Sequence, residues 1–377
     1  MSEQRAPGAG VDDGPPTGPV AVPAARGVDA GERTDMRADI EEAEDRGCPE
    51  CGSTNPPREG SCPSCGAPRV PARDHLEFLL AGCAGLTDRG LRRRRNEDAV
   101  ALGRIETPAG ELLVGVVCDG VASARRGDEA SLAAVEGAVG AVLGAVATGR
   151  AAALDDLAAL SARGAAVAAA ALGEEEGTDP PACTYVGAVV RDGSAVVTWV
   201  GDSRIYWLAS DGTSQLLSTD DSWAEEVAAA GLMSREQAHA DRRAHVLTRW
   251  LGYDSPSGPA RARRFRPAGP GLLLLCSDGL WNHVPDADEL AALVGSEDVL
   301  ADAASLVGAA LDDGGYDNAT VALLPLLPGT GDGEWGRPPE EDTGPITLPP
   351  TDDDPDEAVA SGGETPPVED RPTRSDR

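Results

Sequence analysis

The run Leu112-Leu-Val-Gly-Val-Val-Cys118 is followed directly by Asp119-Gly120, so a strongly apolar, strand-like segment ends in an acidic residue. Three further acidic signatures lie far apart along the chain: Asn96-Glu97-Asp98, Asp278-Gly279 and Asp317-Asn318. Carboxylates that are buried together repel one another and lose their hydration, so aspartates clustered at strand ends indicate a hard divalent cation. We therefore expect these side chains to meet in one metal site.

Two of the other aspartates also lie at the end of an apolar run. Asp278 follows the run 272–276 almost directly, and Asp317 comes just before the run 319–326. Asp119 with Gly120 suits a bridging position, because a residue without Cβ lets its own carbonyl approach one of the ions. Two ions about 3.5 to 4 Å apart can share one ionised water. The pattern therefore predicts a pair of metal ions and a metal-activated hydroxide.

The hydrophobic pattern of the remaining chain predicts strands in runs with helices between them. We expect strands over 76–86, 99–105, 111–118, 184–190, 195–200, 204–208, 271–276 and 319–326. We expect Ala-rich helices over about 127–172, a mixed helical insert over about 222–251 and further helices over about 286–312. Turns at Asp192-Gly193 and Gly201-Asp202-Ser203 join their strands antiparallel. This order indicates an α+β protein built in layers.

Composition divides the chain into five parts. Residues 1–46 and 328–377 are acidic and rich in Gly and Pro, and they bury too little apolar surface to offset their ordering entropy. We expect both of these segments to be disordered. Between them, a cysteine module occupies 47–67, a linker 68–75 and one globular region 76–327.

Charge and hydropathy narrow the class of protein. The 377 residues carry a formal net charge of −32, and all 32 basic residues are arginine. Such an acidic balance argues against binding to a phosphate backbone as the main task. The N-terminus lacks the features of a signal peptide, and the apolar stretch 132–148 is shorter than the roughly 20 residues of a membrane span. We expect a cytoplasmic protein whose partners include neither nucleic acid nor a membrane.

The motifs, taken in order over some 250 residues, resemble those of the metal-dependent 2C-type (PPM) serine/threonine protein phosphatases. The resemblance rests on Thr87-Asp88-Arg89-Gly90, Asn96-Glu97-Asp98, Val116–Gly120 with Gly127–Ser131, Gly201–Arg204, Ser277–Leu280 and Asp317–Thr320. Each motif alone is weak, and their common order carries the resemblance. The fold it implies is a four-layer α-β-β-α sandwich.

The resemblance also implies roles for individual residues. Asp119, Asp278 and Asp317 would be metal-bound carboxylates, and Gly120 would donate its carbonyl. Glu97 and Asp98 would hold metal-bound waters, and Asp202 would correspond to a ligand of a weaker third metal found in some members of the family. The cofactors implied are two Mn²⁺ or Mg²⁺ ions.

Arg93 lies four residues before Glu97, the spacing at which the family places its phosphate-binding arginine. A guanidinium offers a planar, permanently charged fork for phosphoryl oxygens. The neighbouring Arg92, Arg94 and Arg95 have no such assignment, and they fit either a solvated surface or an aid to substrate recruitment.

Three positions depart from the family pattern. Val121-Ala122-Ser123 follows Asp119-Gly120 where a histidine is frequent, so the general acid of some relatives is missing. Trp281-Asn282 stands where some relatives supply another Asp, which weakens the third-metal interpretation, and Asp221-Ser222 replaces a more usual His-Ser. The histidines fit structural or exposed positions better than catalytic ones: His75, His239, His245 and His283.

The cysteine module contains two Cys-x-x-Cys-Gly knuckles, Cys48 to Gly52 and Cys62 to Gly66. Four thiolates at this spacing predict a tetrahedral, structural Zn²⁺ ribbon with ligands Cys48, Cys51, Cys62 and Cys65. A pair of disulfides is the alternative, and it conflicts with a cytosolic location. Arg58 is outweighed by Glu50 and Glu59, so a ribbon that docks a protein partner is favoured over one that binds nucleic acid.

We therefore expect a phosphatase that hydrolyses phosphoserine and phosphothreonine in proteins, the products of a serine/threonine kinase, by direct attack of the metal-activated water. One alternative is a phosphatase fold with weak turnover that acts as a phosphoprotein or partner sensor through its ribbon, motivated by Val121 and Asn282. Another is a nucleic-acid factor led by the ribbon, which the acidic balance opposes.

Overall fold

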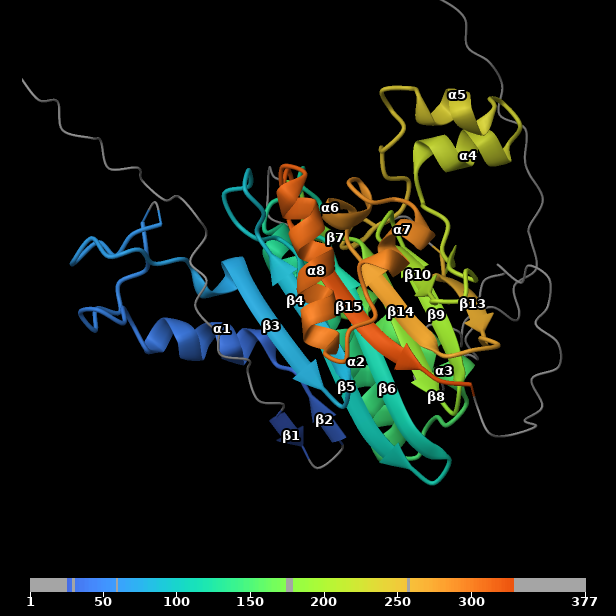
Figure 1. Ribbon diagram of the computed structural model, residues 1–377, viewed down its shortest axis with the longest axis horizontal. Coiled ribbons are helices and arrows are strands. Elements are labelled where there is room, and N and C mark those ends of the chain that lie inside the picture. Colours follow the sequence, from blue (N-terminus) through green and yellow to red (C-terminus); the bar gives the residue numbers. More distant parts are fainter. Residues whose placement is uncertain (1–25, 29–30, 59, 174–178, 256–257, 329–377) are drawn as a thin grey trace, which may run out of the picture. The chain divides into compact units, whose positions relative to one another are not determined.

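Two antiparallel sheets lie face to face, with helices on both outer sides (Figure 1). The computed structural model describes residues 26–28, 31–58, 60–173, 179–255 and 258–328. Apolar side chains from the facing sides of both sheets form the main core, and a second core lies between the six-stranded sheet and its helices, so most strands of the sandwich are buried on both faces. The four-layer α-β-β-α prediction is confirmed.

The first sheet has seven strands in the order β1-β2-β5-β6-β8-β9-β13. Their bounds are Arg26–Val28, Gly31–Arg33, Ala99–Thr107, Gly110–Cys118, Tyr185–Arg191, Ser194–Val200 and Arg261–Phe265. The hairpin between β8 and β9 turns at Asp192 and Gly193, which both have positive φ, as the predicted tight turn requires.

The second sheet has six strands in the order β11-β10-β14-β15-β4-β3. Their bounds are Gln215–Leu216, Arg204–Leu208, Gly271–Cys276, Ala319–Leu326, Cys83–Asp88 and His75–Leu80. The predicted boundaries of β10, β14 and β15 are confirmed at both ends, since each is an apolar run closed by polar or turn residues. A separate two-stranded pair joins β7, Ala182–Cys183, to β12, Leu251–Gly252.

The outer layers are helical. On the seven-stranded sheet lie α2, Gly127–Ala147, and α3, Leu154–Ala170, while α6, Asp278–Trp281, α7, Ala287–Ala292, and α8, Val299–Asp312, cover the six-stranded sheet. A Cβ at Gly137 of α2 would lie 2.5 Å from the carbonyl oxygen of Gly164 in α3. The small residues therefore let these two helix backbones pack closely, as the Ala-rich sequence predicts.

Helix α2 is longer than the predicted apolar stretch. With 21 residues it is, among the described residues, the one helix long and apolar enough to cross a membrane by those criteria alone. More than half of its most apolar window is buried within the protein. Val135, Val139 and Val142 belong to the main core, so the hydrophobic side chains of α2 already pack against the sheet and α3.

The insert after β11 contains two short helices, α4 at Trp223–Ala229 and α5 at Arg235–His239. Each begins at a serine, and Ser234 forms a capping box with Gln237. Asp221, at the base of the insert, is fully buried, accepts the Gly201 amide and pairs with Arg261 at 2.8 Å. The insert is thereby anchored to the sandwich at the position where the family pattern departs.

The structure differs from the sequence prediction at 31–46. Strand β2 pairs with β5, and the Thr34 backbone amide donates to the Leu102 carbonyl at 3.0 Å. Helix α1, Met36–Asp45, is capped by Asp35 and buries Met36. Backbone pairing at the sheet edge and one buried methionine thus order a segment whose composition is acidic. Residues 1–25, 29–30 and 329–377 lie outside the described residues.

The predicted linker 68–75 also contains ordered elements. A short 3-10 helix, η1 at Ala72–Asp74, precedes β3, which begins at His75. Arg73 donates hydrogen bonds to the Asn96 carbonyl at 2.7 Å and to the Asp128 carbonyl at 2.8 Å. Arg73 therefore holds the backbone of the acidic motif 96–98 in place.

Other elements also differ from the sequence prediction. Strands β9 and β10, which the sequence predicts to be joined antiparallel by the turn at 201–203, do not pair and belong to different sheets. The expected strand 76–86 is the hairpin β3–β4, whose turn uses positive φ at Ala81 and Gly82. Strand β13 escaped prediction because its sequence Arg-Ala-Arg-Arg-Phe carries charges at an edge, where they reach solvent or acidic partners. Helix α6 is a single turn, too short for a periodic pattern.

Candidate active site

The strand registers bring the acidic motifs to one end of both sheets. Ala99 at the start of β5 pairs with Cys118 at the end of β6, and Ala319 at the start of β15 pairs with Asp88 at the end of β4. Arg204, which begins β10, pairs with Cys276, which ends β14. Because neighbouring strands run antiparallel, the residues just outside these termini converge although some of them are more than 200 positions apart in sequence.

A cavity of about 150 Å³ opens at this point. Its walls contain six of the predicted residues with charged side chains, together with Gly120: Arg93, Glu97, Asp119, Asp202, Asp278 and Asp317. Thr184, His245, Leu247 and Asn318 complete most of the lining. The predicted carboxylates therefore share one small, largely polar space.

Asp98 lies fully buried close to this cavity. Its Oδ2 accepts a 2.7 Å hydrogen bond from the Ser277 hydroxyl, while Oδ1 has no hydrogen-bond partner among the described residues. Burial raises the pKa of Asp98 to about 7, and the nearby charges of Asp317 and Asp278 add to the shift. A buried carboxylate oxygen without a partner is an unsatisfied acceptor that a cation or its bound water would satisfy.

Four of the cavity carboxylates also resist ionisation in the absence of a cation. Burial, followed by repulsion from neighbouring carboxylates, raises the pKa of Asp119 and of Asp202 well above the usual range. The same two causes, with Asp317 as the main neighbour, raise the pKa of Asp278 to about 6. Burial likewise raises the pKa of Glu97. Oxygen-only donors under this mutual repulsion fit hard divalent cations such as Mn²⁺ or Mg²⁺.

The carboxylates of the cavity are less tightly grouped than the sulfurs of the cysteine module. Among the described residues, the four cysteines are the one group of potential ligands whose atoms all lie within 4.8 Å of one another. The cavity carboxylates are spread more widely.

The glycines of the acidic motifs are required by close backbone packing. A Cβ at Gly120 would lie 2.6 Å from the carbonyl carbon of Gly127 and 2.8 Å from the Glu97 carbonyl oxygen. A Cβ at Gly279 would fall far inside van der Waals contact with the Asn318 carbonyl oxygen. The sequence pattern gave Gly120 a role through its own carbonyl, and the packing supplies a second reason for glycine there.

Arg93 and Asp317 form an ion pair in the cavity wall. Asp317 is therefore shared between the arginine and the group of carboxylates. The hydrogen bond to Asp317 raises the pKa of Arg93 further, so the guanidinium is charged at any physiological pH. The Arg93 side chain lies in the wall of the cavity, and the family pattern assigns this arginine to phosphate binding.

Asn318 is a functional residue to which the sequence analysis gave no role. Its Oδ1 accepts the Glu97 backbone amide at 2.9 Å, and its Nδ2 donates to the carbonyls of Arg89 at 2.8 Å and Arg95 at 3.0 Å. One side chain thus holds both ends of the arginine loop, which we define as residues 89–97. In the sequence, this role is indicated by the position of Asn318 directly after Asp317.

The histidines differ in their surroundings. His75 contacts Asp88 at 2.6 Å, His239 contacts Glu225 at 2.9 Å, and His283 contacts Asp313 at 2.7 Å, all in structural pairs. His245 is exposed and also lines the cavity from the insert, a position that no local motif indicates.

The cysteine module brings its four sulfurs together. The distance between the Sγ atoms is 3.7 Å for Cys48 and Cys65, and 3.7 Å for Cys51 and Cys62. These distances exclude disulfides, whose sulfurs lie about 2.05 Å apart, and they match the edge of roughly 3.8 Å expected for a tetrahedron with Zn–S bonds of about 2.3 Å. Backbone amides of Cys65 and Ser64 lower the pKa of Cys62 to about 6. The donor set therefore fits a zinc ion.

Comparisons with known proteins agree with this geometry. A family model described as Protein phosphatase 2C matches residues 91–307, more than half of the chain. A putative protein phosphatase 2C-type from Streptococcus pyogenes serotype M6 is 32% identical over 154 residues, which cover 41% of this chain and 61% of the relative. The serine/threonine phosphatase stp of Listeria innocua is 36% identical over 144 residues, covering 37% of this chain and 55% of the relative. The chain thus spans roughly three fifths of these curated relatives.

Solved structures match over a larger share. The S. agalactiae serine/threonine phosphatase superposes with a TM-score of 0.53 at 26% identity, covering 64% of this chain and 97% of that chain. The Mycobacterium tuberculosis serine/threonine phosphatase PstP/Ppp gives a TM-score of 0.53 at 24% identity, covering 65% and 98%, and shows the fold alone. The PstP catalytic domain solved with two manganese ions gives 0.51 at 23% identity, covering 65% and 97%, again for the fold alone.

Proposed function

Since the chain belongs to the protein phosphatase 2C family, we propose that it hydrolyses phosphoserine and phosphothreonine in proteins with Mn²⁺ or Mg²⁺ as cofactor. The observation that carries this proposal is the cavity of about 150 Å³ in which Asp119, Asp278 and Asp317 stand beside Arg93. Such a donor set binds hard cations, and the arginine supplies the complementary contact for a phosphoryl group.

The residues of the cavity would have different roles in the proposed reaction. Asp119, Asp278, Asp317 and the Gly120 carbonyl would hold two cations, which when bound lower the pKa of water and offset phosphoryl charge. Glu97 and Asp98 would orient waters around them, and Asp202 would serve a weaker third ion. Ser277 fixes Asp98 through its hydroxyl, so the orientation of this carboxylate does not depend on ligand binding.

Arg93 has a role of its own in substrate capture. Its guanidinium pairs with Asp317 in the absence of substrate, and one face of the fork is available to phosphoryl oxygens. Substrate binding would redistribute this pairing, while cations near Asp317 would take over the neutralisation of its charge. Water would attack phosphorus in line with the serine or threonine oxygen, which would leave with a proton from solvent. No phosphoenzyme is needed, since no cysteine or histidine nucleophile motif is present in the sequence.

We assign the cysteine module a structural Zn²⁺ held by Cys48, Cys51, Cys62 and Cys65, and a protein partner as its target. The sulfur spacing of 3.7 Å and the closed four-thiolate set support the ion. The division into a ribbon at 47–67 and a catalytic domain at 76–327, and a cytoplasmic location, belong to the same proposal. The substrates would be products of a serine/threonine kinase.

The test is hydrolysis of a phosphothreonine peptide by the full chain with Mn²⁺. We expect turnover in the wild type and a loss of at least about a hundredfold in Asp119→Asn, because an amide neither bridges cations nor carries the charge that binds them. Asp156→Asn on α3 removes an exposed carboxylate outside the cavity and serves as the matched control. An inactive wild type, or full activity in Asp119→Asn, would refute the assignment and favour the sensor alternative.

A further inference from the structure

A second hollow adjoins the candidate catalytic cavity. It measures about 570 Å³, and we call it the arginine pocket. Six guanidinium groups line it with one carboxylate: Arg92, Arg93, Arg94, Arg95, Arg125 and Arg126, with Glu97. Arg93, Glu97 and Ala122 line both spaces, so the two hollows share a wall.

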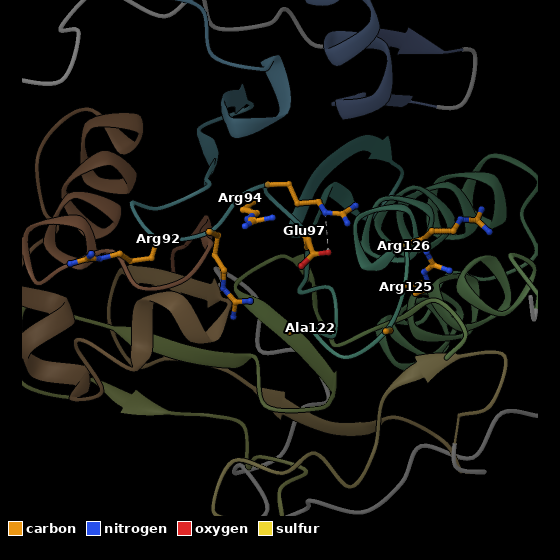
Figure 2. A pocket seen from close by; sticks show the side chains of 9 residues that line it. Arg92, Arg94, Glu97, Ala122, Arg125 and Arg126 are labelled. Atoms are coloured by element: carbon orange, nitrogen blue, oxygen red, sulfur yellow. Dashed lines mark ion pairs between the residues drawn. The ribbon is translucent and has the colours of Figure 1, made fainter. Parts of the chain in front are cut away.

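Two separate segments build the arginine pocket. Figure 2 shows Arg92 and Arg94 of the arginine loop on one side of Glu97, and Arg125 and Arg126 on the other. The second segment leads from Asp119-Gly120 into α2, and its last residue, Arg126, adopts a left-handed φ of 61°. Arginines from two separate parts of the sequence thus face one hollow.

Both segments are held in place by hydrogen bonds to their backbone groups. Asn318 fixes the arginine loop at the Arg89 and Arg95 carbonyls. On the other side, the Val121 amide donates to the Ala182 carbonyl at 2.9 Å, and the Ala124 amide donates to the Val121 carbonyl at 2.8 Å. The scaffold of the pocket is therefore set before any ligand arrives, and only side-chain ends remain to be ordered.

Several of the six arginines are already paired. Arg93 pairs with Asp317, and Arg126 pairs with Glu129. Arg95 lies 3.6 Å from both Glu97 and Asp128, with a side chain that is 62% exposed. These three guanidinium groups are at least partly neutralised by the protein itself.

The charges of the other three arginines are not offset by a neighbouring carboxylate within the described part of the chain. Within the described part of the chain, Arg94 and Arg125 have no carboxylate partner and are exposed, and Arg92 only lies over the Tyr316 ring at 5.8 Å. Three unneutralised guanidinium groups around one hollow are notable in a chain with a net charge of −32. Like charges at such spacing repel, so an anion between them relieves the repulsion.

We propose that the arginine pocket binds a second phosphate of the substrate while the first occupies the catalytic cavity. The inference rests on the proposed phosphatase function and names its substrate class: protein segments with two phosphorylated residues close in sequence. A phosphate carries nearly two charges and three acceptor oxygens, so it engages several guanidinium forks at once. A single carboxylate has one charge and two oxygens, and it matches three arginines less well.

The test uses three peptides of one sequence with a single hydrolysable phosphothreonine. The first has no other anion, the second carries a non-hydrolysable phosphonate analogue of phosphoserine two to four residues away, and the third carries glutamate at that place. In the wild type we expect the second peptide to show a KM about five- to tenfold lower than the first, the scale of a few exposed ion pairs. The glutamate peptide should gain less than about twofold.

Variants assign that gain to the arginine pocket. In Arg94→Gln/Arg125→Gln the KM advantage of the phosphonate peptide should fall below about twofold. Arg163→Gln removes an exposed charge on α3 outside the pocket and should retain the advantage. In the wild type, the advantage should also shrink as salt rises from 0.05 to about 0.5 M, because exposed ion pairs are screened.

Two outcomes would overturn the proposal: an equal gain with glutamate, or an undiminished gain in the double variant. Turnover of the first peptide by the wild type reports the phosphatase function by itself. Failure of the further inference is thereby distinguishable from failure of the proposed function.

Discussion

The Ser277 hydroxyl donates a 2.7 Å hydrogen bond to the Asp98 carboxylate, and this contact ties the two sheets together at the candidate active site. Ser277 follows β14 of the six-stranded sheet, and Asp98 precedes β5 of the seven-stranded sheet. The same hydroxyl accepts the Thr320 amide at 3.0 Å. A single serine therefore fixes the position of a buried acid relative to both layers.

Ser277→Ala should lower both stability and turnover. Removing the hydroxyl leaves the buried Asp98 Oδ2 without its donor and the Thr320 amide without its acceptor, at a cost of about 1 to 3 kcal/mol. Chemical unfolding and peptide hydrolysis measure the two effects. Ser305→Ala on α8 removes an exposed hydroxyl that donates to its own helix, and it should change stability by less than about 0.5 kcal/mol. Equal stabilities for the two variants would contradict the role given to Ser277.

The metal-free protein should lose stability as pH rises from about 4 to about 7. Asp98 has a pKa of about 7 in the folded state against an ordinary value of 3.8, so the folded state binds more protons in this window. The stabilisation that protonated Asp98 contributes is fully present at pH values below its pKa in the unfolded chain. It is lost as the pH rises through its pKa in the folded protein. Thermal unfolding in chelator at several pH values measures the slope.

The Asp98→Asn variant provides the control for that slope, because an amide does not titrate. Its unfolding temperature should depend less on pH than that of the wild type, while the contribution of the cysteine module is common to both proteins. Parallel pH profiles would contradict the assignment. Added Mn²⁺ should stabilise the wild type more at pH 8 than at pH 5.5, since protons compete with the cation for the same oxygens.

Gly279→Ala should be strongly destabilising. The new Cβ would overlap the Asn318 carbonyl oxygen, which is backbone and cannot move without shifting β15. We expect a loss of about 2 kcal/mol or more, measured by denaturant unfolding. Gly308→Ala in α8 meets nothing within 4 Å and should instead stabilise by about 0.5 to 1 kcal/mol. A neutral Gly279→Ala would show that the Asp278-Gly279 motif tolerates a side chain.

Cys62→Ser should abolish zinc binding by the cysteine module. With one of four thiolates removed, the tetrahedral set is incomplete, and the bound zinc should fall from about one ion per chain to below about one tenth. Elemental analysis of the purified full chain measures this ratio. Ser64→Ala, which removes only a hydroxyl bonded to Ser53, should keep the metal. Full zinc content in Cys62→Ser would exclude the proposed ligand set.

The sequence predicted those parts of the molecule that local chemistry specifies. Strands β10, β14 and β15 are apolar runs with clear stops, and their ends match the prediction. The aspartates of the cavity were found because each directly adjoins such a strand or its turn. Their convergence was inferred from the chemistry of clustered carboxylates and from the family resemblance, because no single segment specifies the register between distant strands.

What the sequence did not predict depends on tertiary contacts. Residues 31–46 become ordered only because β5 offers an edge and the core accepts Met36. The hairpin turn at Ala81-Gly82 uses a positive φ that alanine seldom adopts, so the sequence predicts one continuous strand here although Gly82 can turn. Asn318 gained its role by reaching two carbonyls more than 220 residues away. Each of these cases is decided by a partner distant in the chain.

The hold of Asn318 on the arginine loop has a mechanical consequence. Arg92, Arg93, Arg94 and Arg95 carry four consecutive positive charges, and a free segment of that kind would stretch out under its own self-repulsion. The neutral amide of Asn318 spans the loop and tethers it at both ends, at the Arg89 and Arg95 carbonyls. Curvature in this loop, and with it the concentration of positive potential beside the acidic cavity, is thus maintained by a side chain that has no charge itself.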